Sequence, residues 1–363
     1  MKIIIAYASA GTGHRRAAEA VYNYFKENCP GADLKIIDAL KKTNFVFRNI
    51  YSHGYVFLIN HALWLWHLAF WLTSIKALRP LTHIVNFLLY RLNAKNFFDF
   101  LIQEKPDVII STHFLPCEIA AHLNKVNKLN SRLVSVITDF GIHPFWVLEG
   151  IDMYIVASPF TKEQLILKGV SAQIIKDLGI PIDLKFSKQY DKNVLCRKLG
   201  IEPDKFTVLI STGSSGIGGI EEIVESLYKQ VQILVVSAHN KTLYARLTKK
   251  NYPQVKVFGF IENMQELMAV SDIIITKPGG LTISESLAMG LLPIFITAIP
   301  GQETENAKIL AEHSIGINIK DPPLIKDTVL DFKEHPDKLK KIKEEINKLK
   351  RPLVVKDLCD VIC

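Results

Sequence analysis

The chain has few cysteines and no C-x-x-C pair among them. This usage argues against a disulfide-rich secreted domain, which needs an even set of paired cysteines. An odd number of scattered cysteines in a chain of 363 residues is typical of reduced thiols in the cytosol. We therefore expect five free thiols, at Cys29, Cys117, Cys196, Cys359 and Cys363.

A secretory leader is also lacking, since the first residues, MKIIIAYAS, run directly into a glycine turn, and we expect no export. The sequence has no arginine-rich arm, no zinc-finger spacing and no aromatic RNA-binding motif. It does have 44 Lys and Arg against 36 Asp and Glu, a formal net charge of +8. We expect no nucleic-acid partner, and a phosphorylated substrate or an anionic membrane surface instead.

Short apolar runs separated by stretches of helical length recur along the chain, as in a parallel sheet covered by helices. Two glycine-rich turns, SAGTG and GSSGIGG, each follow such a run, so the pattern occurs twice. We predict an α/β protein with one doubly wound domain over residues 1–185, a second over 186–345, and a final helix over 346–363 that returns to the first. The later buried strands are predicted at 34–38, 107–112, 133–138, 153–158, 207–212, 232–237, 256–260, 272–277 and 292–297.

One segment departs from this pattern, because the 27 residues between Arg48 and Lys76 carry no formal charge. Their length suits a helix across a bilayer of ~30 Å. However, the strands before and after the segment belong to one sheet, and a single crossing would separate them. We predict an interfacial helix on the cytoplasmic face of the membrane, anchored by Trp64, Trp66 and Trp71. A buried core helix is the alternative.

The turn SAGTGHRRAAEA places a histidine at the start of a helix. Gly11 and Gly13 let a ligand approach the backbone, and the positive end of the helix disfavours an imidazolium at His14. A neutral His14 is a candidate general base for an acceptor hydroxyl, although a histidine that only packs on the turn fits equally. The turn lacks the Gly-Lys-Ser/Thr of an ATP-binding loop.

Further polar residues follow predicted strands of the same sheet. Asp139 and His113 each come at the carboxyl edge, where doubly wound folds place their sites. Together with His14 they form a candidate catalytic and acceptor-binding cluster. His143 and Trp146, in the loop after Asp139, either line the site or fill a corner of the fold.

The segment 276–307, TKPGGLTISESLAMGLLPIFITAIPGQETENA, gives the strongest local signal. Its glycines would open a helix whose N-terminus can hold a diphosphate, with Lys277 adding positive charge. One turn further, Glu285 can accept hydrogen bonds from two ribose hydroxyls. Polar residues after the next strand supply the donors and acceptors that sugar hydroxyls require. The candidate donor-binding residues here are Lys277, Gly279, Gly280, Leu281, Thr282, Glu285, Gln302, Glu303 and Asn306.

The ordered set GTGHRRAAEA, VITDFGIHPFWV, FGFIENM, TKPGGLTISESLAMGLLPI and PGQETEN resembles the family of monogalactosyldiacylglycerol synthases and processive diacylglycerol glucosyltransferases, in glycosyltransferase family 28. The resemblance covers nearly the whole chain. It implies a GT-B fold, two Rossmann-like domains facing a central cleft, with the acceptor lipid on the first domain and the UDP-sugar on the second.

Residue by residue, the resemblance implies a diphosphate loop, a uracil rim, a ribose-binding Glu285, a hexose-contacting pair Gln302 and Glu303, and His14 as base. The loop and rim positions are Gly213, Ser214, Ser215, Phe260 and Ile261. The sequence departs from the family at SAHNKTL, where a Cys-Gly-x-Asn pattern is common. Asn240 keeps the match, and the backbone at Ala238 and His239 differs.

The resemblance implies inverting transfer of glucose or galactose from a UDP-sugar to diacylglycerol, with His14, assisted by Asp139, taking the proton. No D-x-D motif is present, so we expect no metal and no cofactor, with helix termini and Lys277 stabilising the leaving diphosphate. Alternatives are N-acetylglucosaminyl transfer to a prenyl-linked peptidoglycan precursor, epimerisation of UDP-N-acetylglucosamine, which the Trp-rich segment disfavours, and a non-catalytic UDP-sugar sensor docking on membranes.

Overall fold

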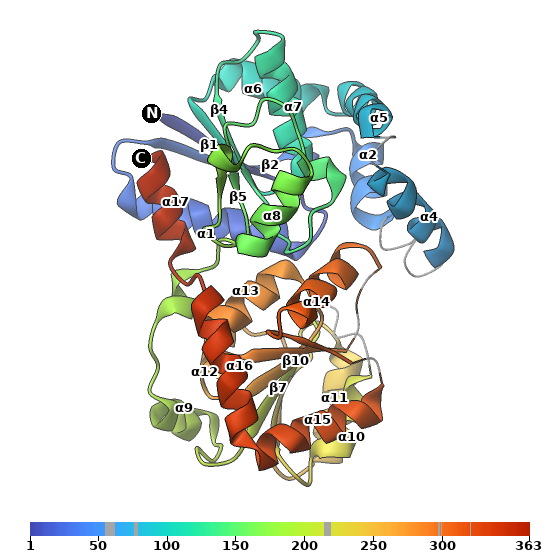
Figure 1. The fold of residues 1–363 in the computed structure, drawn as a ribbon, viewed down its shortest axis with the longest axis vertical. Coiled ribbons are helices and arrows are strands. Elements are labelled where there is room, and N and C mark those ends of the chain that lie inside the picture. The colour runs from blue at the N-terminus through green and yellow to red at the C-terminus, as the bar shows by residue number, and fades with distance from the viewer. Residues whose placement is uncertain (55–61, 76–78, 214–218, 297, 299, 320) are drawn as a thin grey trace. The chain divides into compact units, whose positions relative to one another are not determined.

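The computed structural model describes residues 1–363 apart from 55–61, 76–78, 214–218, 297, 299 and 320. The chain divides into two compact units, and each is built on its own parallel sheet of six strands (Figure 1). The first unit comprises residues 1–183, 299–302 and 353–363, and the second comprises 184–298 and 303–352. The doubly wound α/β architecture predicted from the sequence is therefore confirmed within each unit.

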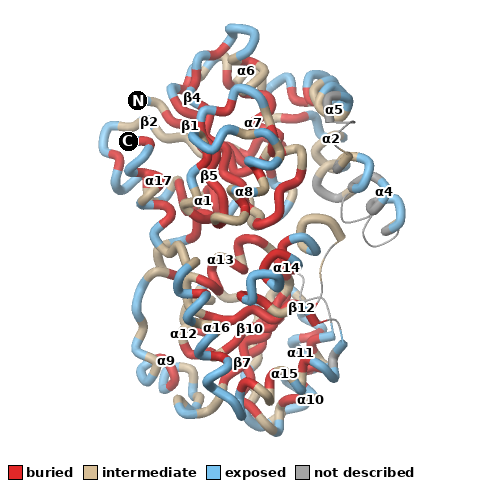
Figure 2. Tube along the Cα trace, in the orientation of Figure 1, coloured by how far each residue is buried: buried red, intermediate tan, exposed pale blue. Residues whose placement is uncertain are grey.

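The first sheet has the order β2-β1-β3-β4-β5-β6. β1 is continuously apolar, with Ile3, Ile4 and Ile5 fully buried, because helices cover both faces of a parallel sheet (Figure 2). The strands are β1 Lys2–Tyr7, β2 Asp33–Asp38, β3 Val108–Ser111, β4 Arg132–Val136, β5 Met153–Ile155 and β6 Ile175–Lys176. The helices are α1 Thr12–Asn28, α2 Phe45–Asn49, α4 Leu63–Ser74, α5 Arg79–Asn93, α6 Lys95–Glu104, α7 Phe114–Lys125, α8 Pro159–Leu167 and α17 Val354–Ile362.

The second sheet has the order β12-β11-β10-β7-β8-β9, and all its neighbouring strands are parallel. The strands are β7 Thr207–Ser211, β8 Gln232–Val236, β9 Val255–Phe258, β10 Ile273–Thr276, β11 Leu292–Phe295 and β12 Ile317–Asn318. The helices are α9 Lys192–Leu199, α10 Ile220–Leu227, α11 Lys241–Lys250, α12 Met264–Ala269, α13 Gly280–Ala288, α14 Gln302–Glu312, α15 Pro322–Glu334 and α16 Pro336–Leu349.

The described part of the uncharged segment forms short helical pieces. α2 ends at Asn49, a π-helical turn follows over Ile50–Gly54, and α4 has only 12 residues. Within the residues that the structure describes, no helix combines the length and the apolar character needed to cross a bilayer.

The last helix, α17, packs on α1 in the first unit. It buries one apolar face, which includes Val355, Leu358 and Ile362. α17 begins at Val354, later than residue 346, because α16 continues to Leu349 and the chain then passes through Pro352.

The expectation of five free thiols is wrong at two positions. Where α17 packs on α1, Cys29 and Cys363 form a disulfide. The other cysteines, Cys117, Cys196 and Cys359, are free and buried. The two bonded residues are 334 positions apart, so no local spacing in the sequence predicts the pair.

Candidate active site

Both sheets reverse their strand order next to the first strand of the unit. In the first unit β1 lies between β2 and β3, and in the second β7 lies between β10 and β8. Ligands of open α/β sheets bind beyond the carboxyl ends of the strands at such a reversal. We therefore expect ligands to bind at the turns after β1 and β3 and at those after β7 and β10.

His14 lies in the first turn of α1, directly after the turn that follows β1. Its Nδ1 is 2.8 Å from the carbonyl oxygen of Thr112 and 2.8 Å from the hydroxyl of Thr138. A carbonyl oxygen only accepts hydrogen bonds, so Nδ1 carries the ring proton. In the neutral ring Nε2 then holds the lone pair, as a general base requires.

The surroundings of His14 favour this neutral form. Burial lowers the pKa of the imidazole below its usual 6.5, and the negative charge of Asp139 acts in the opposite direction. The hydroxyl of Thr112 also donates to the backbone carbonyl of His14, at 2.9 Å. The start of α1 is thus tied to the end of β3 by two bonds, which fix the position of the ring.

His113 contacts His14, with ring centroids 4.7 Å apart. Its own Nδ1 accepts a hydrogen bond from the backbone N–H of Leu115, so His113 caps the start of α7. Burial lowers the pKa of His113 well below the usual value, which keeps this ring neutral as well. The structure therefore places His113 beside the candidate base, as a capping residue that packs on it.

His143 and Trp146 fill a corner of the fold. The ring of His143 caps the short 3-10 helix Pro144–Trp146, and its Nε2 lies 3.3 Å from the hydroxyl of Thr73 in α4. Burial lowers the pKa of His143 to about 4. Trp146 is only 1% exposed and belongs to the hydrophobic core, and its role in acceptor binding stays a prediction.

In the second unit, α13 opens at the carboxyl end of β10. Gly279 is its N-cap, and the first helical hydrogen bond runs from the N–H of Ile283 to the carbonyl of Gly279. The N–H groups before Ile283 therefore have no partner within the helix, and the helix dipole makes this end attractive to an anion. Nothing lies within 4 Å of a Cβ built on Gly279, so the turn is open to a ligand.

Lys277 and Gly213 meet beside this helix start. Gly213, after β7, has φ of +77°, and a Cβ there would come within 3.0 Å of the Lys277 side chain. Only glycine therefore suits the position. The ammonium of Lys277 pairs with the carboxylate of Glu303 at 2.9 Å. Ser214 and Ser215, predicted beside Gly213, lie outside the described residues.

Two predicted donor-binding residues, Glu285 and Asn306, are buried. Glu285 lies one turn inside α13 and is 6% exposed. Asn306 in α14 is fully buried, and its side-chain amide donates to the carbonyl of Pro278 at 3.0 Å. This bond holds the turn between Lys277 and Gly279 in place, and a contact of Asn306 with the hexose stays a prediction.

The remaining predicted donor-site residues begin helices or line a loop. Gln302 and Glu303 begin α14 and are half-buried, and Asn240 caps α11 by accepting a hydrogen bond from the N–H of Leu243. Phe260 is 54% exposed beside the half-buried Ile261, and its ring stacks on His239 at 4.8 Å.

Three residues that contact predicted site residues were not predicted from the sequence. Thr112 and Thr138 each follow a buried strand and come immediately before a predicted site residue, His113 or Asp139. Their position at the end of a predicted strand was the available signal. His239, the partner of Phe260, lies in the part of the loop that departs from the family pattern, and no signal in the sequence indicated the stacking.

The chain is similar to known proteins in both sequence and fold. A family model described as monogalactosyldiacylglycerol (MGDG) synthase matches residues 14–182, and one described as glycosyltransferase family 28 C-terminal domain matches residues 207–358. The processive diacylglycerol beta-glucosyltransferase of Bacillus pumilus is 30% identical over 356 residues, which cover 96% of this chain and 91% of that protein.

Solved structures with this fold include MurG of Acinetobacter baumannii, with a TM-score of 0.61, 14% identity, and 99% and 98% of the two chains covered. The HepE protein of Anabaena in complex with UDP-glucose gives a TM-score of 0.57 at 16% identity, over 100% of this chain and 99% of that chain. The GT-B fold class predicted from the sequence is confirmed.

Proposed function

Since the chain belongs to the glycosyltransferase family of monogalactosyldiacylglycerol synthases and processive diacylglycerol glucosyltransferases, we propose that it transfers a hexose, glucose or galactose, from a UDP-sugar to a hydroxyl of diacylglycerol. The name of the Bacillus pumilus relative supports diacylglycerol as acceptor, and the UDP-glucose complex of HepE supports the class of donor.

The observation that carries the proposal is the fixed tautomer of His14. With Nδ1–H donated to the carbonyl of Thr112, Nε2 accepts the proton of the lipid hydroxyl. The hydroxyl oxygen attacks the anomeric carbon of the sugar as UDP leaves from the opposite side, so the configuration inverts. Asp139 assists by stabilising the imidazolium that forms, because its charge favours the protonated ring.

The second unit supplies the donor site in this proposal. Negative charge builds on the diphosphate as the sugar leaves, and the N-terminal end of α13 and the ammonium of Lys277 are placed to balance it. Glu285 accepts hydrogen bonds from the ribose, and Phe260 borders the uracil. Because charges of the protein itself stabilise the leaving diphosphate, we expect activity to persist when divalent metals are chelated.

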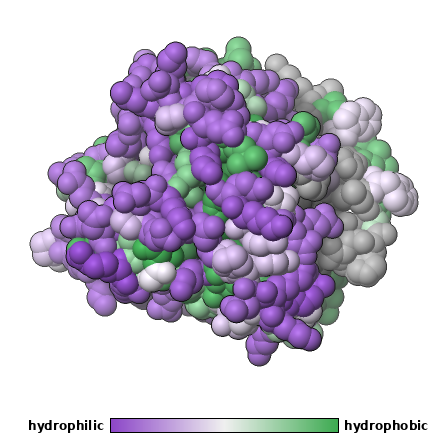
Figure 3. Space-filling view, turned by 90° about the horizontal axis from the view of Figure 1, so that it is seen from below, coloured by the Kyte–Doolittle hydropathy of each residue, from purple (hydrophilic) through white to green (hydrophobic). Residues whose placement is uncertain are grey.

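The same unit as His14 exposes many apolar side chains on α2, α4 and α5. On α5 they recur every three or four residues, while His83, on the other side of that helix, bonds Glu118 of α7 at 2.7 Å. By contrast, the face in Figure 3 is mainly hydrophilic. The exposed apolar residues are Phe45, Val46, Ile50, Trp64, Leu65, Leu68, Trp71, Leu72, Leu81, Ile84, Val85, Leu88, Leu89 and Leu92. The side chain of Trp66 lies outside the described part.

An exposed apolar helix face marks a site of contact with a partner. Because the proposed acceptor is a lipid held in a membrane, we infer that the partner is the membrane surface. Arg48 on α2 and the exposed Arg91 on α5 add charge that attracts anionic headgroups. We therefore propose peripheral attachment to an anionic membrane on its cytoplasmic face, through α2, α4 and α5 together and not through the Trp-rich segment alone.

The test is an assay of donors and acceptors. The protein is incubated with UDP-glucose, UDP-galactose or UDP-N-acetylglucosamine over anionic vesicles with and without diacylglycerol, and the lipid products are identified by mass spectrometry. We expect glycosyl-diacylglycerol from UDP-glucose or UDP-galactose, also in the presence of EDTA. A product formed only from UDP-N-acetylglucosamine on a prenyl-linked acceptor would support the alternative transferase. Binding of UDP without any product would support the sensor.

A further inference from the structure

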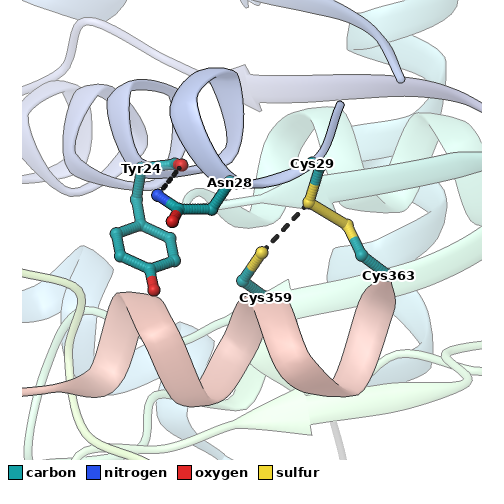
Figure 4. The surroundings of a disulfide bond; sticks show 5 residues. All are labelled: Tyr24, Asn28, Cys29, Cys359 and Cys363. Atoms are coloured by element: carbon teal, nitrogen blue, oxygen red, sulfur yellow. Dashed lines mark hydrogen bonds between the residues drawn. A yellow bond between two sulfur atoms is a disulfide. The ribbon is translucent and has the colours of Figure 1, made fainter. Parts of the chain in front are cut away.

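Three cysteine sulfurs meet where α17 packs on α1. Cys29 directly follows α1, Cys359 lies in α17, and Cys363 directly follows α17, one helical turn after Cys359. Cys29 is bonded to Cys363, while the thiol sulfur of Cys359 lies 3.0 Å from the sulfur of Cys29 (Figure 4). The three sulfurs all lie within 4.8 Å of one another. The glycosyl transfer proposed above uses none of them.

We propose that this three-cysteine cluster is a thiol–disulfide exchange site, in which Cys359 displaces Cys363 from its bond to Cys29. The sulfur of Cys359, as thiolate, attacks the sulfur of Cys29. The Cys29–Cys359 bond forms, the Cys29–Cys363 bond breaks, and Cys363 leaves as a thiolate that takes up the proton given by Cys359. The number of disulfides and of electrons is unchanged, so the step needs no oxidant.

Burial distinguishes the two states of the cluster. Cys29 and Cys359 are buried, whereas Cys363 is exposed. Exchange therefore moves the disulfide to the two buried sulfurs and releases an exposed thiol, which is accessible to small thiols and alkylating reagents. Burial raises the pKa of Cys359, so the thiol form predominates before exchange. In both states a covalent bond holds α17 on α1.

The test follows which cysteine is free. Unreduced protein is incubated with iodoacetamide, unfolded under acid quench and digested with trypsin. Cleavage after Lys356 gives one peptide, DLCDVIC, that contains both Cys359 and Cys363, and cleavage after Lys26 gives ENCPGADLK with Cys29. The two peptides stay joined by the disulfide and are fragmented in a mass spectrometer. The fragment ions show which cysteine of DLCDVIC carries the carbamidomethyl group and was therefore free. We expect a fraction of the wild-type pairs to carry the group on Cys363, which means that Cys29 is bonded to Cys359.

Three variants decide the outcome. Cys363→Ser, oxidised with diamide, should form the Cys29–Cys359 link. Cys359→Ser should keep the Cys29–Cys363 link and lose the labelling of Cys363. Cys196→Ser removes a buried thiol of the second unit and should behave as wild type.

Far-UV circular dichroism checks that each variant is folded. The proposal is overturned if folded Cys363→Ser protein forms no Cys29–Cys359 link under conditions in which Cys359→Ser forms its link. Equal labelling of Cys363 in wild type and Cys359→Ser would also overturn it, because the exposed thiol would then arise without Cys359.

Discussion

The two sheets end in similar turns that carry different side chains. After β1 of the first unit a glycine turn leads into α1 and His14, and after β10 of the second a glycine turn leads into α13 with Lys277 beside it. The first turn joins two neutral histidines, the half-buried His14 and the buried His113, whereas the second offers an ammonium and backbone N–H groups that have no partner within the helix.

This difference shows how one fold serves two kinds of chemistry. A helix N-terminus favours negative charge, so it binds a diphosphate when its first turn is open, and it keeps an imidazole neutral when a histidine occupies that turn. The first unit thus suits proton transfer, and the second suits binding of an anion. The predictions below test whether the two roles separate.

The largest effect is expected for His14→Ala. Removing a general base lowers turnover by about 10²–10⁴-fold. The measurement is the initial rate of glycolipid formation at saturating UDP-sugar. His313→Ala, which changes an exposed histidine of the second unit, should retain the wild-type rate. If His14→Ala retains a normal rate with chemistry rate-limiting, the base lies elsewhere, and Asp139 is the next candidate.

A smaller effect is expected for Glu285→Ala. A buried carboxylate that holds ribose hydroxyls contributes about 1.5–3 kcal/mol for each hydrogen bond, so UDP affinity should fall by about 10- to 150-fold for each bond lost. Isothermal titration calorimetry with UDP gives the value. Glu305→Ala, an exposed acid in the first turn of α14, is the matched control. An unchanged affinity in folded Glu285→Ala protein would remove this residue from the donor site.

A third effect concerns the lipid surface of the first unit. Leu88→Ser with Leu92→Ser should lower partition onto anionic vesicles by about tenfold, because burying one leucine contributes about 1.5–3 kcal/mol and docking buries it only in part. Leu167→Ser, at an 84% exposed leucine of α8, is the control. Vesicle sedimentation at low and high salt measures both. If the control and the double variant release equally, α5 does not face the membrane.

The smallest effect is on the pH profile. A base must be neutral to act, and burial holds the pKa of His14 below 6.5, so the rate should persist as the pH falls through 6.5 and decline only below it. Asp139 raises that pKa, and Asp139→Asn should move the decline to lower pH. The profile of kcat/KM reports this midpoint. A shift to higher pH would contradict the assigned interaction.

Much of the fold follows from apolar runs and glycine turns. The strands that cross the middle of each sheet were predicted because both their faces are buried, so that the runs are continuous. β6 and β12 were missed, since each has only two residues and leaves no pattern to detect. These short edge strands depend on pairing with β5 and β11 rather than on their own sequence.

The candidate site was predicted less completely than the fold. His14 was found because it follows a recognisable turn, but the carbonyl that fixes its tautomer belongs to Thr112, 98 residues away. Asn306 and Trp146 were assigned to ligands because amides and indoles suit both binding and packing. Only the tertiary structure shows that both side chains are buried.

The measurement that tests the division of roles most directly is the UDP affinity of His14→Ala protein. If the first unit provides the base and the second unit binds the donor, the variant that loses turnover should bind UDP within about twofold of wild type by calorimetry. A loss of affinity of about tenfold or more in folded protein would show that His14 takes part in donor binding, which would contradict the separation of the two sites.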